Sequence, residues 1–292
     1  MASWRALLIT TALFTAALAA QAQEGTTGIS MVESSSINAA DSKWGVSFYN
    51  LSSAPVGQLG EGPSVFTYNY LGLNYKFNKT QRASFRPVFH HTTSGKDKWG
   101  RDSKSDTVLG DAHFVYADYE MAALGPANVS MSFKFYIPTS EGSQNNGQLL
   151  KFRPETFISW GVGRYNAVTY VLKPDFFVQS RASNFDSRGR EYTTYVFDLE
   201  HYLEFSWSIN RTFKLKPAAG FSDSWSNPSK NPRVSTRKTE AKLALGLDIY
   251  ARRGLSFTIS AENKFSVADR RDDVAIMRPE ENSLLFITNA SL

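Results

Sequence analysis

Apolar and polar residues alternate with a period of two from Lys43 to the end of the chain. At residues 129–137, for example, Val, Met, Phe, Phe and Ile alternate with Ser, Ser, Lys and Tyr. This is the period of a β-strand whose two faces meet different surroundings, and no helical period competes with it. The pattern predicts twelve strands, at residues 43–51, 64–77, 82–92, 106–121, 127–138, 150–163, 166–180, 191–208, 211–222, 237–251, 254–267 and 282–292.

The segments between these strands are of two kinds, which alternate along the chain. One kind is short, as in FNKTQ, AALGPA, GRYN, the residues around Asn210, and ARRG. The other kind is long and polar, as in SGKDKWGRDSKSD, SEGSQNNGQ and DSWSNPSKNPRVSTRK. Short turns at one end and long loops at the other are typical of an outer-membrane β-barrel, whose short turns face the periplasm.

A soluble β-sandwich would show the same alternation, so alternation alone does not separate the two folds. Strands of about ten residues or more, and an even number of strands with both chain ends on the short-turn side, favour the membrane. Aromatic residues also lie near strand ends, as expected at membrane interfaces; they are Trp44, Phe77, Trp160, Trp207 and Tyr250. We therefore predict an all-β, transmembrane, antiparallel up-and-down barrel in the cell outer membrane.

The first residues have the features of a secretory signal peptide. A single cation, Arg5, precedes an apolar run from Ala6 to Ala20, and an A-x-A triplet ends at Ala22. We predict a signal peptide over 1–22, a periplasmic N-terminal tail or plug over 23–42, which is rich in Ser, Gly and Thr, and the barrel over 43–292.

Composition narrows the chemistry and the partners. The chain has no Cys, which excludes disulfides, zinc thiolates and a thiol nucleophile. Its 32 basic and 27 acidic residues are spread along the sequence, whereas a nucleic-acid partner would favour a concentrated basic face. The final strand, with alternating Leu284, Phe286, Thr288, Ala290 and Leu292, resembles the assembly signal of outer-membrane barrels, although its last residue is not aromatic. The expected partners are outer-membrane lipid, the assembly machinery and a small polar solute, with no nucleic acid and no cofactor.

An apolar residue, a cation and a proline follow one another at four places: FRPVF, FRPETF, LKPDFF and LKPAAGF. The face assignment turns the prolines, Pro87, Pro154, Pro174 and Pro217, toward lipid and the flanking charges toward the lumen. Proline donates no ladder hydrogen bond, and a closed barrel has no free edge where that loss would be harmless. We therefore expect each proline at a bulge, or high in the wall where the neighbouring strand has ended.

The charged residues beside these prolines pair with opposite charges across the predicted hairpins. If the hairpin from Leu150 to Ser180 turns about Arg164, and the one from Thr236 to Val267 about Arg252, the opposed pairs are Arg153 with Asp175, Glu155 with Lys173, Glu240 with Lys264, and Lys242 with Glu262. Around Asn210, Glu204 faces Lys216. Opposite charges directly across a strand pair stabilise its register, and a one-residue slip would place them in lipid.

The same face assignment predicts a lumen lined by charges of both signs: Arg86, Lys134, Arg153, Glu155, Lys173, Asp175, Asp198, Glu200, Glu204, Lys214, Lys216, Glu240, Lys242, Asp248, Glu262 and Lys264. Two interpretations stay open. Either these charges line a conducting channel, or they fill and stiffen the interior without conducting, since ion-pair networks form with or without a function.

Over the mature chain the pattern resembles the twelve-stranded outer-membrane barrels of Gram-negative bacteria. This group includes nucleoside-specific channels, acidic-oligosaccharide channels and outer-membrane phospholipase A. The stretches LGDAHFVYADYEM and FYIPTSEG resemble the GD…Y…PTG pattern of porin-like barrels assigned to transport, with Gly110, Asp111 and Pro138 at the matching positions. The resemblance implies the architecture and passive transport without naming a solute.

The stretch FHHTTSG is the strongest enzymatic candidate, because it has the spacing of the H-x-S-N-G motif of outer-membrane phospholipase A. Thr93 stands at the position of the nucleophilic Ser, Ser94 stands at that of the Asn, and no downstream Asn is evident to orient His91. We therefore expect no enzyme. A metal site built from His90, His91 and His113 is disfavoured, because adjacent strand residues point to opposite faces.

These features favour a porin-like, narrow channel for small polar or charged solutes with a charge-paired lumen. The alternative is a structural or surface-interaction barrel with a closed lumen, and an outer-membrane lipid hydrolase is the third hypothesis.

Overall fold

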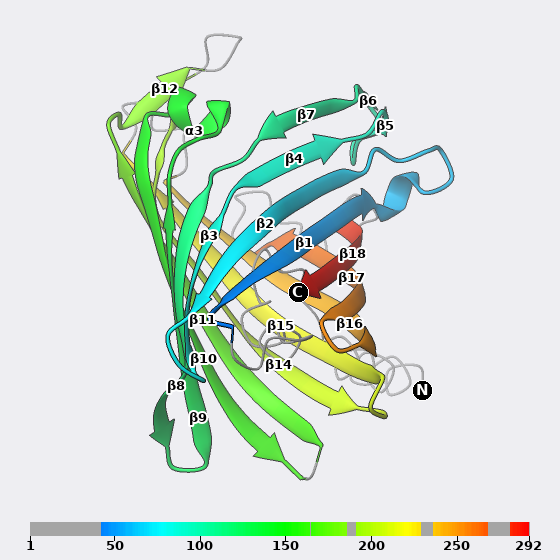
Figure 1. Ribbon diagram of the computed structural model, residues 1–292. Coiled ribbons are helices and arrows are strands. Elements are labelled where there is room, and N and C mark those ends of the chain that lie inside the picture. Colours follow the sequence, from blue (N-terminus) through cyan, green and yellow to red (C-terminus); the bar gives the residue numbers. More distant parts are fainter. Residues whose placement is uncertain (1–41, 164, 186–190, 229–235, 268–280, 292) are drawn as a thin grey trace, which may run out of the picture.

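The computed structural model describes residues 42–163, 165–185, 191–228, 236–267 and 281–291 (Figure 1). These residues form one antiparallel sheet that closes on itself into a barrel. The predicted signal peptide and nearly all of the N-terminal tail or plug lie outside the described residues and stay predictions.

The wall of the barrel contains twelve strand positions within the described part of the chain, as predicted. Two positions are each divided into two segments, β3 with β4 and β7 with β8. In chain order the wall strands are β1 (Trp44–Pro55), β2 (Phe66–Lys76), β3 (Gln81–Arg86), β4 (Val88–Thr92), β7 (Asp106–Leu109), β8 (His113–Leu124), β9 (Ala127–Tyr136), β10 (Gln148–Val162), β11 (Asn166–Gln179), β14 (Tyr195–Ser208), β15 (Phe213–Ser226), β16 (Arg237–Arg252), β17 (Leu255–Ser266) and β18 (Asn282–Ser291). The first strand, β1, pairs with both β18 and β2 and so closes the barrel.

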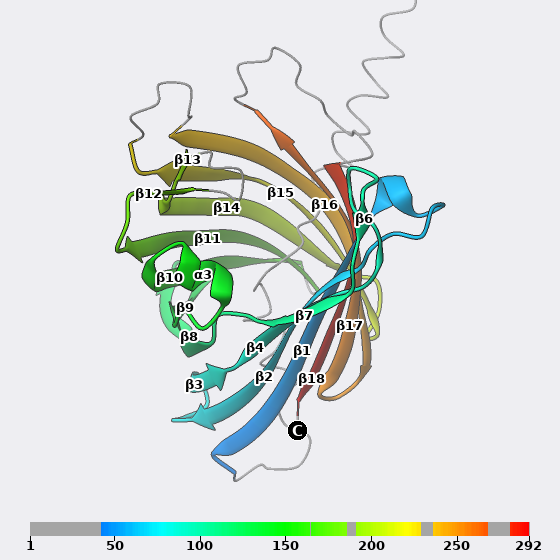
Figure 2. The ribbon, with the colours of Figure 1, turned by 90° about the horizontal axis from the view of Figure 1, so that it is seen from above.

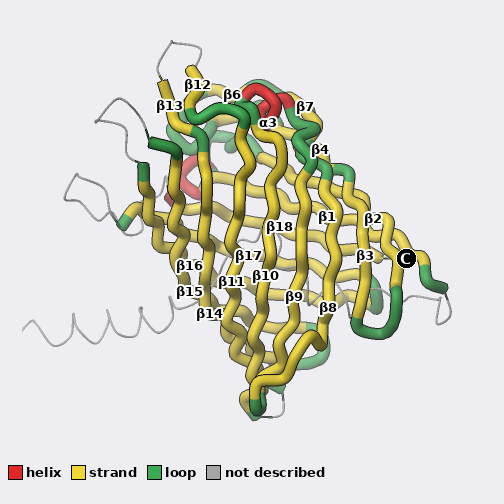
Figure 3. The backbone as a smooth tube through the Cα atoms, turned by 90° about the vertical axis from the view of Figure 1, so that its left-hand side faces the viewer, coloured by secondary structure: helices red, strands yellow, loops and turns green. Residues whose placement is uncertain are grey.

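The two ends of the barrel differ as the connection lengths predict (Figures 1 and 3). Short turns lie at one end. The other end carries small elements that were not predicted: η1 (Val56–Gln58), the pair β5 (Gly95–Lys96) and β6 (Asp102–Ser103), α3 (Glu141–Asn145), and β12 (Ser183–Phe185). β12 pairs with β13 (Glu191–Thr193), the first part of the strand predicted at 191–208, which is separate from β14. Viewed from above, α3 and β6 lie on different sides of the opening (Figure 2). Among the described residues, no helix has the length and apolar character that a membrane span requires.

The two faces of the wall differ in the sense expected for a membrane barrel. On β9, Phe135 is 44% exposed, whereas the adjacent Lys134 is 4% exposed. The outward face therefore carries large apolar side chains and the inward face carries buried polar ones, which is the reverse of a soluble β-protein. This arrangement and the single closed sheet exclude the soluble β-sandwich.

An outward row of apolar side chains crosses nine neighbouring strands, with each member directly opposite the next. Its members are Trp225, Phe197, Phe176, Phe152, Phe135, Phe114, Phe85, Leu73 and Val46. The ring centroids of Phe135 and Phe152 are 4.7 Å apart, and those of Phe176 and Phe197 are 5.1 Å apart. Cross-strand aromatic pairs stabilise a sheet, so this row ties together most of the wall on its lipid-facing side.

The expectation for the prolines is confirmed at Pro87, which separates β3 from β4. There, two residues at 87–88 face three at 110–112, which is a one-residue bulge. The bulge lets Val88 accept a hydrogen bond from the Gly110 N–H at 3.0 Å.

The expectation is wrong for the other three prolines, because the register is continuous on both sides of each. Pro154 and Pro174 lie at opposed positions of β10 and β11, and around them the ladder is interrupted at residues 153–155 and 173–175 and resumes in the same register. At such an opposed pair, a residue other than proline would donate its N–H to the carbonyl of the residue across from it. Because both residues are prolines, the two missing ladder hydrogen bonds lie at one place in the wall. Pro217 interrupts the β14–β15 ladder in the same way, between the Glu204–Ala218 and Trp207–Leu215 pairs.

Two predicted registers are shifted by two residues. On β16 and β17, Lys242 lies opposite Lys264 and Glu240 opposite Ser266, so the predicted opposition of Glu240 with Lys264 is wrong. The chain turns at Arg253 and Gly254, with Gly254 at φ +81°, rather than about Arg252. The partner of Glu204 on β15 is Ala218 rather than Lys216. A two-residue shift leaves every side chain on its face, so the face assignments are unaffected.

Candidate functional site

Four charged side chains from three strands form the first group on the inner face. Arg153 Nε donates to Asp175 Oδ1 at 2.6 Å, and Arg153 Nη2 contacts Asp175 Oδ2, so the predicted pair forms and its geometry is bidentate. Glu155 is fully buried and accepts from Lys134 Nζ at 2.8 Å and from Ser132 Oγ at 2.9 Å. Arg153 Nη1 lies 4.0 Å from Glu155 Oε1, which joins the two pairs.

The predicted ion pair between Glu155 and Lys173 does not form, although the two residues lie across from each other. Glu155 bonds Lys134 on the other neighbouring strand, and Lys173 Nζ lies 3.5 Å from Glu200 Oε1. Lys242 Nζ donates to the second oxygen of Glu200 at 3.1 Å. Glu200 therefore joins two cations in a second group that reaches from β11 to β16.

A third group lies closer to the short turns. Lys216 Nζ is 3.5 Å from Glu204 Oε1 and 3.1 Å from Asp248 Oδ2. The predicted contact between Glu204 and Lys216 thus exists as a diagonal pair rather than a direct one. Asp248 Oδ1 also accepts from Thr258 Oγ1 at 2.6 Å.

The predicted pairs of Glu240 with Lys264 and of Lys242 with Glu262 are wrong, because the β16–β17 register differs by two residues. Lys264 Nζ instead lies 2.7 Å from Glu262 Oε1 on its own strand. Glu240 Oε1 lies 2.7 Å from Lys238 Nζ, also on its own strand.

The last three predicted lining residues stand apart from these groups. Arg86 donates to Ser84 Oγ at 3.1 Å. Asp198 lies opposite Asp175, so two acids adjoin across β11 and β14. Lys214 Nζ lies 5.3 Å from the ring centroid of Tyr250, beside a cavity of about 780 Å³ at the short-turn end.

Aromatic side chains form a continuous inner track that the sequence analysis did not identify. We call this set the aromatic track; it consists of Phe66, His90, Tyr68, Tyr70, Tyr49, His113 and Tyr136. Neighbouring rings have centroids between 4.7 and 6.2 Å apart. Tyr49 and Tyr70 are stacked at 4.9 Å, and His113 and Tyr136 are 4.7 Å apart. The signal was present in YNYLGLNY at 68–75, where Tyr68, Tyr70, Gly72 and Asn74 share one face and Leu71 and Leu73 the other.

A cavity of about 210 Å³ lies along this track, below α3. Its wall includes three cations, Arg86, Lys134 and Lys151, and one carboxylate, Asp111. Arg86 lies with its guanidinium carbon 4.8 Å from the ring centroid of Tyr70, and Lys151 Nζ lies 3.9 Å from that of Tyr136. Such distances are typical of cation–π contacts.

The GD and PTS stretches of the sequence hold α3 over the cavity. Asp111 Oδ1 accepts from the Ser140 N–H at 3.0 Å, and Asp111 Oδ2 accepts from Ser143 Oγ at 2.5 Å and from Gln148 Nε2 at 3.3 Å. Thr139 Oγ1 donates to the Gly110 carbonyl at 2.6 Å. Asp111 therefore anchors the first turn of α3 in the loop end of the barrel, a structural role for the motif.

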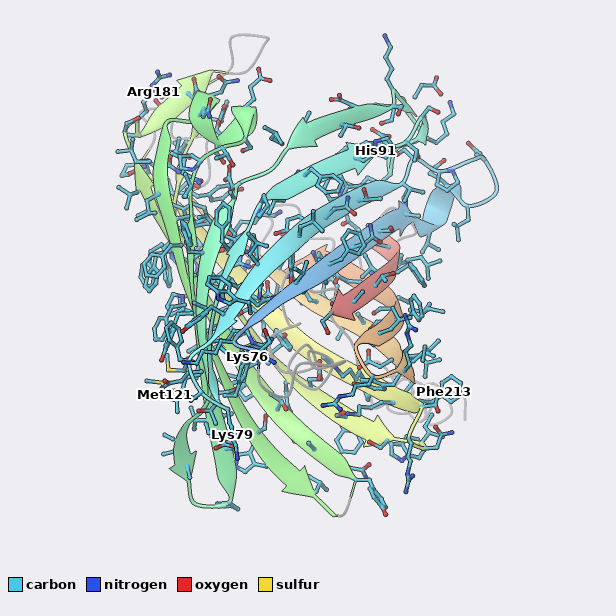
Figure 4. The ribbon with its side chains drawn as sticks, in the orientation of Figure 1. Lys76, Lys79, His91, Met121, Arg181 and Phe213 are labelled. Carbon is cyan, nitrogen blue, oxygen red and sulfur yellow. The ribbon has the colours of Figure 1, made fainter. Side chains whose placement is uncertain are left out.

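The residues of the enzymatic candidate have other partners. Thr93 Oγ1 accepts from the Val65 N–H at 2.8 Å, and His91 Nδ1 lies 2.8 Å from Thr107 Oγ1. His91 lies near the loop end in Figure 4. In the described ranges, no cluster of three or more His, Cys, Asp or Glu has the geometry to hold a metal ion.

The fold is similar to that of an outer membrane channel from Pseudomonas putida F1. The TM-score is 0.56 at 11% identity, over 88% of this chain and 100% of that chain. The NanC porin gives 0.47 at 10% identity over 85% of this chain and 100% of that chain, and the beta domain of the Bordetella autotransporter BrkA gives 0.48 at 11% identity over 86% and 100%. No protein-family model matches the chain, and no curated protein matches it in sequence.

This is an outer-membrane β-barrel fold. The apolar outer belt requires hydrocarbon around it, and closed barrels with short turns at one end and long loops at the other belong to the outer membranes of Gram-negative bacteria. The chain is accordingly an outer-membrane protein.

Proposed function

We propose that the barrel is a narrow, porin-like channel for small polar or charged solutes. The observation that carries this proposal is the pair of cavities at the two ends, about 210 Å³ near α3 and about 780 Å³ near the short turns. Along the β10–β11 hairpin, Arg153 and Glu155 lie between Lys151, which lines the first cavity, and Tyr165, which lines the second. A twelve-stranded barrel is intermediate between filled eight-stranded barrels and open porins, so inward side chains decide its bore.

The ion-paired groups are the expected constriction. Charges of both signs on neighbouring strands from β9 to β17 offer hydrogen-bonding partners to a solute that has lost part of its water. They also project long side chains into the lumen, which favours passage of small solutes over large ones.

Planar-bilayer recording of the purified protein tests the proposal. We expect small, discrete conductance steps in potassium chloride. Lys214→Met removes a cation beside the turn-end cavity and should shift the reversal potential in a salt gradient toward cation selectivity. Lys79→Met, at an exposed position in the short turn after β2, is the matched control and should leave it unchanged (Figure 4). A conducting barrel whose selectivity is identical in all three proteins would contradict the assignment of Lys214 to the pathway.

A closed structural barrel is the second candidate, and the depth of burial favours it. Glu155 is 0% and Lys173 1% exposed, as expected if the ion-paired groups fill the middle of the barrel. Folded, heat-modifiable protein that inserts into bilayers without any conductance step would support this candidate against the channel.

We propose no enzymatic activity, because Thr93 and His91 are bonded to other groups and no described contact joins them. Release of fatty acid from phospholipid vesicles by the purified protein, abolished by His91→Ala, would overturn this.

A further inference from the structure

The cavity below α3 combines two kinds of surface that suit one class of ligand. The first is the aromatic track, which begins at Phe66, 37% exposed, and leads past Tyr68 and Tyr70 to the deeply placed Tyr136. Aromatic faces attract other rings in offset-stacked or edge-to-face arrangements. A ring that enters the loop end therefore meets aromatic partners along the whole track.

The second kind of surface is cationic and lies beside the inner part of the track. The guanidinium of Arg86 is next to Tyr70, and the ammonium of Lys151 is next to Tyr136. Within the described part of the chain, the Arg86 guanidinium donates to the Ser84 hydroxyl and forms no salt bridge. A planar guanidinium matches a carboxylate with two parallel hydrogen bonds.

We propose that this cavity binds a small aromatic carboxylate, with its ring on the aromatic track and its carboxylate toward Arg86 and Lys151. The proposal rests on the channel function and names the solute class of that pathway. The volume of about 210 Å³ lies below the ~300–1,000 Å³ of pockets for drug-sized ligands, which favours a single small ring.

The lining argues against the neighbouring classes of solute. A sugar acid has no aromatic ring to stack on the track. An organic cation would meet three cationic side chains. A neutral ring would use the track but would make no charge-assisted contact with Arg86.

Calorimetric titration of the detergent-solubilised full-length protein tests the proposal with defined probes. Benzoate should bind, while acetate, which lacks the ring, and benzamide, which lacks the charge, should each bind about tenfold more weakly, a difference of about 1.4 kcal/mol. The affinity for glucuronate, compared with that for benzoate, shows whether the cavity prefers a sugar acid or an aromatic acid. Equal affinity for benzoate and acetate, or tighter binding of glucuronate than of benzoate, would overturn the proposal.

Variants separate the two surfaces. Arg86→Gln should weaken benzoate binding about tenfold and leave benzamide binding nearly unchanged. Tyr136→Leu should weaken both ring compounds and leave acetate unchanged. Lys79→Met is the matched control at a distant exposed turn, and heat-modifiable migration confirms that each variant is folded. Loss of benzamide binding in Arg86→Gln would contradict a charge-specific role for this residue.

Binding and conduction are measured independently, so the two proposals fail in different ways. Benzoate binding without conductance steps would leave the site in place and exclude the channel. Conductance without benzoate binding would support the channel and overturn the site. Where both hold, benzoate should interrupt the potassium chloride current in the parent protein and do so less in Arg86→Gln.

Discussion

Two sectors of the barrel wall hold their strands together in different ways. The charged sector consists of β10, β11, β14 and β15, and the aromatic sector consists of β18, β1 and β2. In the charged sector the backbone ladder is interrupted at Pro154, Pro174 and Pro217. In the aromatic sector the pairings of β1 with β18 and with β2 run without a gap.

The position of the gaps explains the recurring order of apolar residue, cation and proline. The interruption between β10 and β11 coincides with the bidentate pair of Arg153 and Asp175. The interruption between β14 and β15 coincides with the contact of Lys216 and Glu204. At both gaps a side-chain ion pair therefore joins the two strands where ladder bonds are missing, and we expect the register of the charged sector to depend on these side chains.

The aromatic sector contrasts in its inner face, which is built of apolar, aromatic and amide side chains. Tyr49 is stacked on Tyr70, and Asn74 Nδ2 donates to Ser47 Oγ at 3.1 Å. Here an intact ladder fixes the register, and Tyr49, Tyr68 and Tyr70 form part of the aromatic track beside the proposed ligand site.

Reversing one charge of the charged sector should have the largest effect. Arg153→Glu would place a new carboxylate beside Asp175 and Glu155, with Asp198 opposite Asp175. Breaking a buried pair costs about 3–5 kcal/mol, so little folded barrel should remain on unheated gels. The double change Arg153→Glu with Asp175→Arg restores an opposed pair and should recover much of the loss.

The single change Asp175→Arg completes this cycle, and Asp102→Asn, in an exposed part of the β5–β6 pair, is the control that should behave like the parent protein. Equal behaviour of both singles and the double would show that Arg153 and Asp175 do not interact.

Face assignments could be predicted from the sequence, whereas registers could be predicted only in part. Alternation fixes which residues share a face, and Arg153 lies opposite Asp175 as predicted. Alternation does not reveal a two-residue shift in the pairing register of two strands, however, because every side chain keeps its face. The two-residue turn at Arg253 and Gly254 was therefore placed wrongly, and with it the partners of Lys242.

The aromatic track was missed for a different reason. Charged residues mark an inward face plainly, because lipid excludes them, but Tyr68 and Tyr70 are acceptable on either face at a membrane interface. The anchor of α3 on Asp111 joins segments far apart in the sequence, so no local pattern reveals it. Ser140 as N-cap, followed by Glu141 in the first turn, was the available signal for this short helix.

Replacing glycines should lower the stability of the two sectors by different amounts, both smaller than the loss expected from the charge reversal. A Cβ at Gly220, in the charged sector, would collide with the His201 backbone carbonyl, whereas one at Gly72, in the aromatic sector, would meet the Ser47 hydroxyl, which can rotate away. Gly220→Ala should cost about 1–3 kcal/mol, and Gly72→Ala should cost less. Heat-modifiability midpoints measure both, with Gly161→Ala, which has open space, as the control. A larger loss at Gly72 would contradict the packing described.

At the loop end, Asp111→Asn should have a local effect. The amide retains the size of the carboxylate but loses charge and one acceptor oxygen, which weakens its bonds to Ser140 and Ser143 by about 1 kcal/mol. Hydrogen exchange in α3 should become roughly fivefold faster, with exchange in β1 unchanged. Glu120→Gln, at an exposed position in β8, is the control. Unchanged exchange in α3 would show that other contacts hold the helix.

Restoring a ladder bond at the proline pair should have the smallest effect in the parent protein. Pro154→Val supplies an N–H opposite the Pro174 carbonyl, a gain of about 0.5–1.5 kcal/mol, but loses the rigidity of proline in the unfolded chain, worth about 0.4–1 kcal/mol. The change should therefore be nearly neutral.

If the ion pair replaces the missing bond, Pro154→Val should stabilise a barrel with Arg153→Gln and Asp175→Asn more than it stabilises the parent, because neighbouring contributions to one interface are not additive. Pro217→Val, on another strand pair, should show no such coupling. Denaturant midpoints of all combinations measure the difference, and an equal effect of Pro154→Val in both backgrounds would show that the ladder and the ion pair act independently.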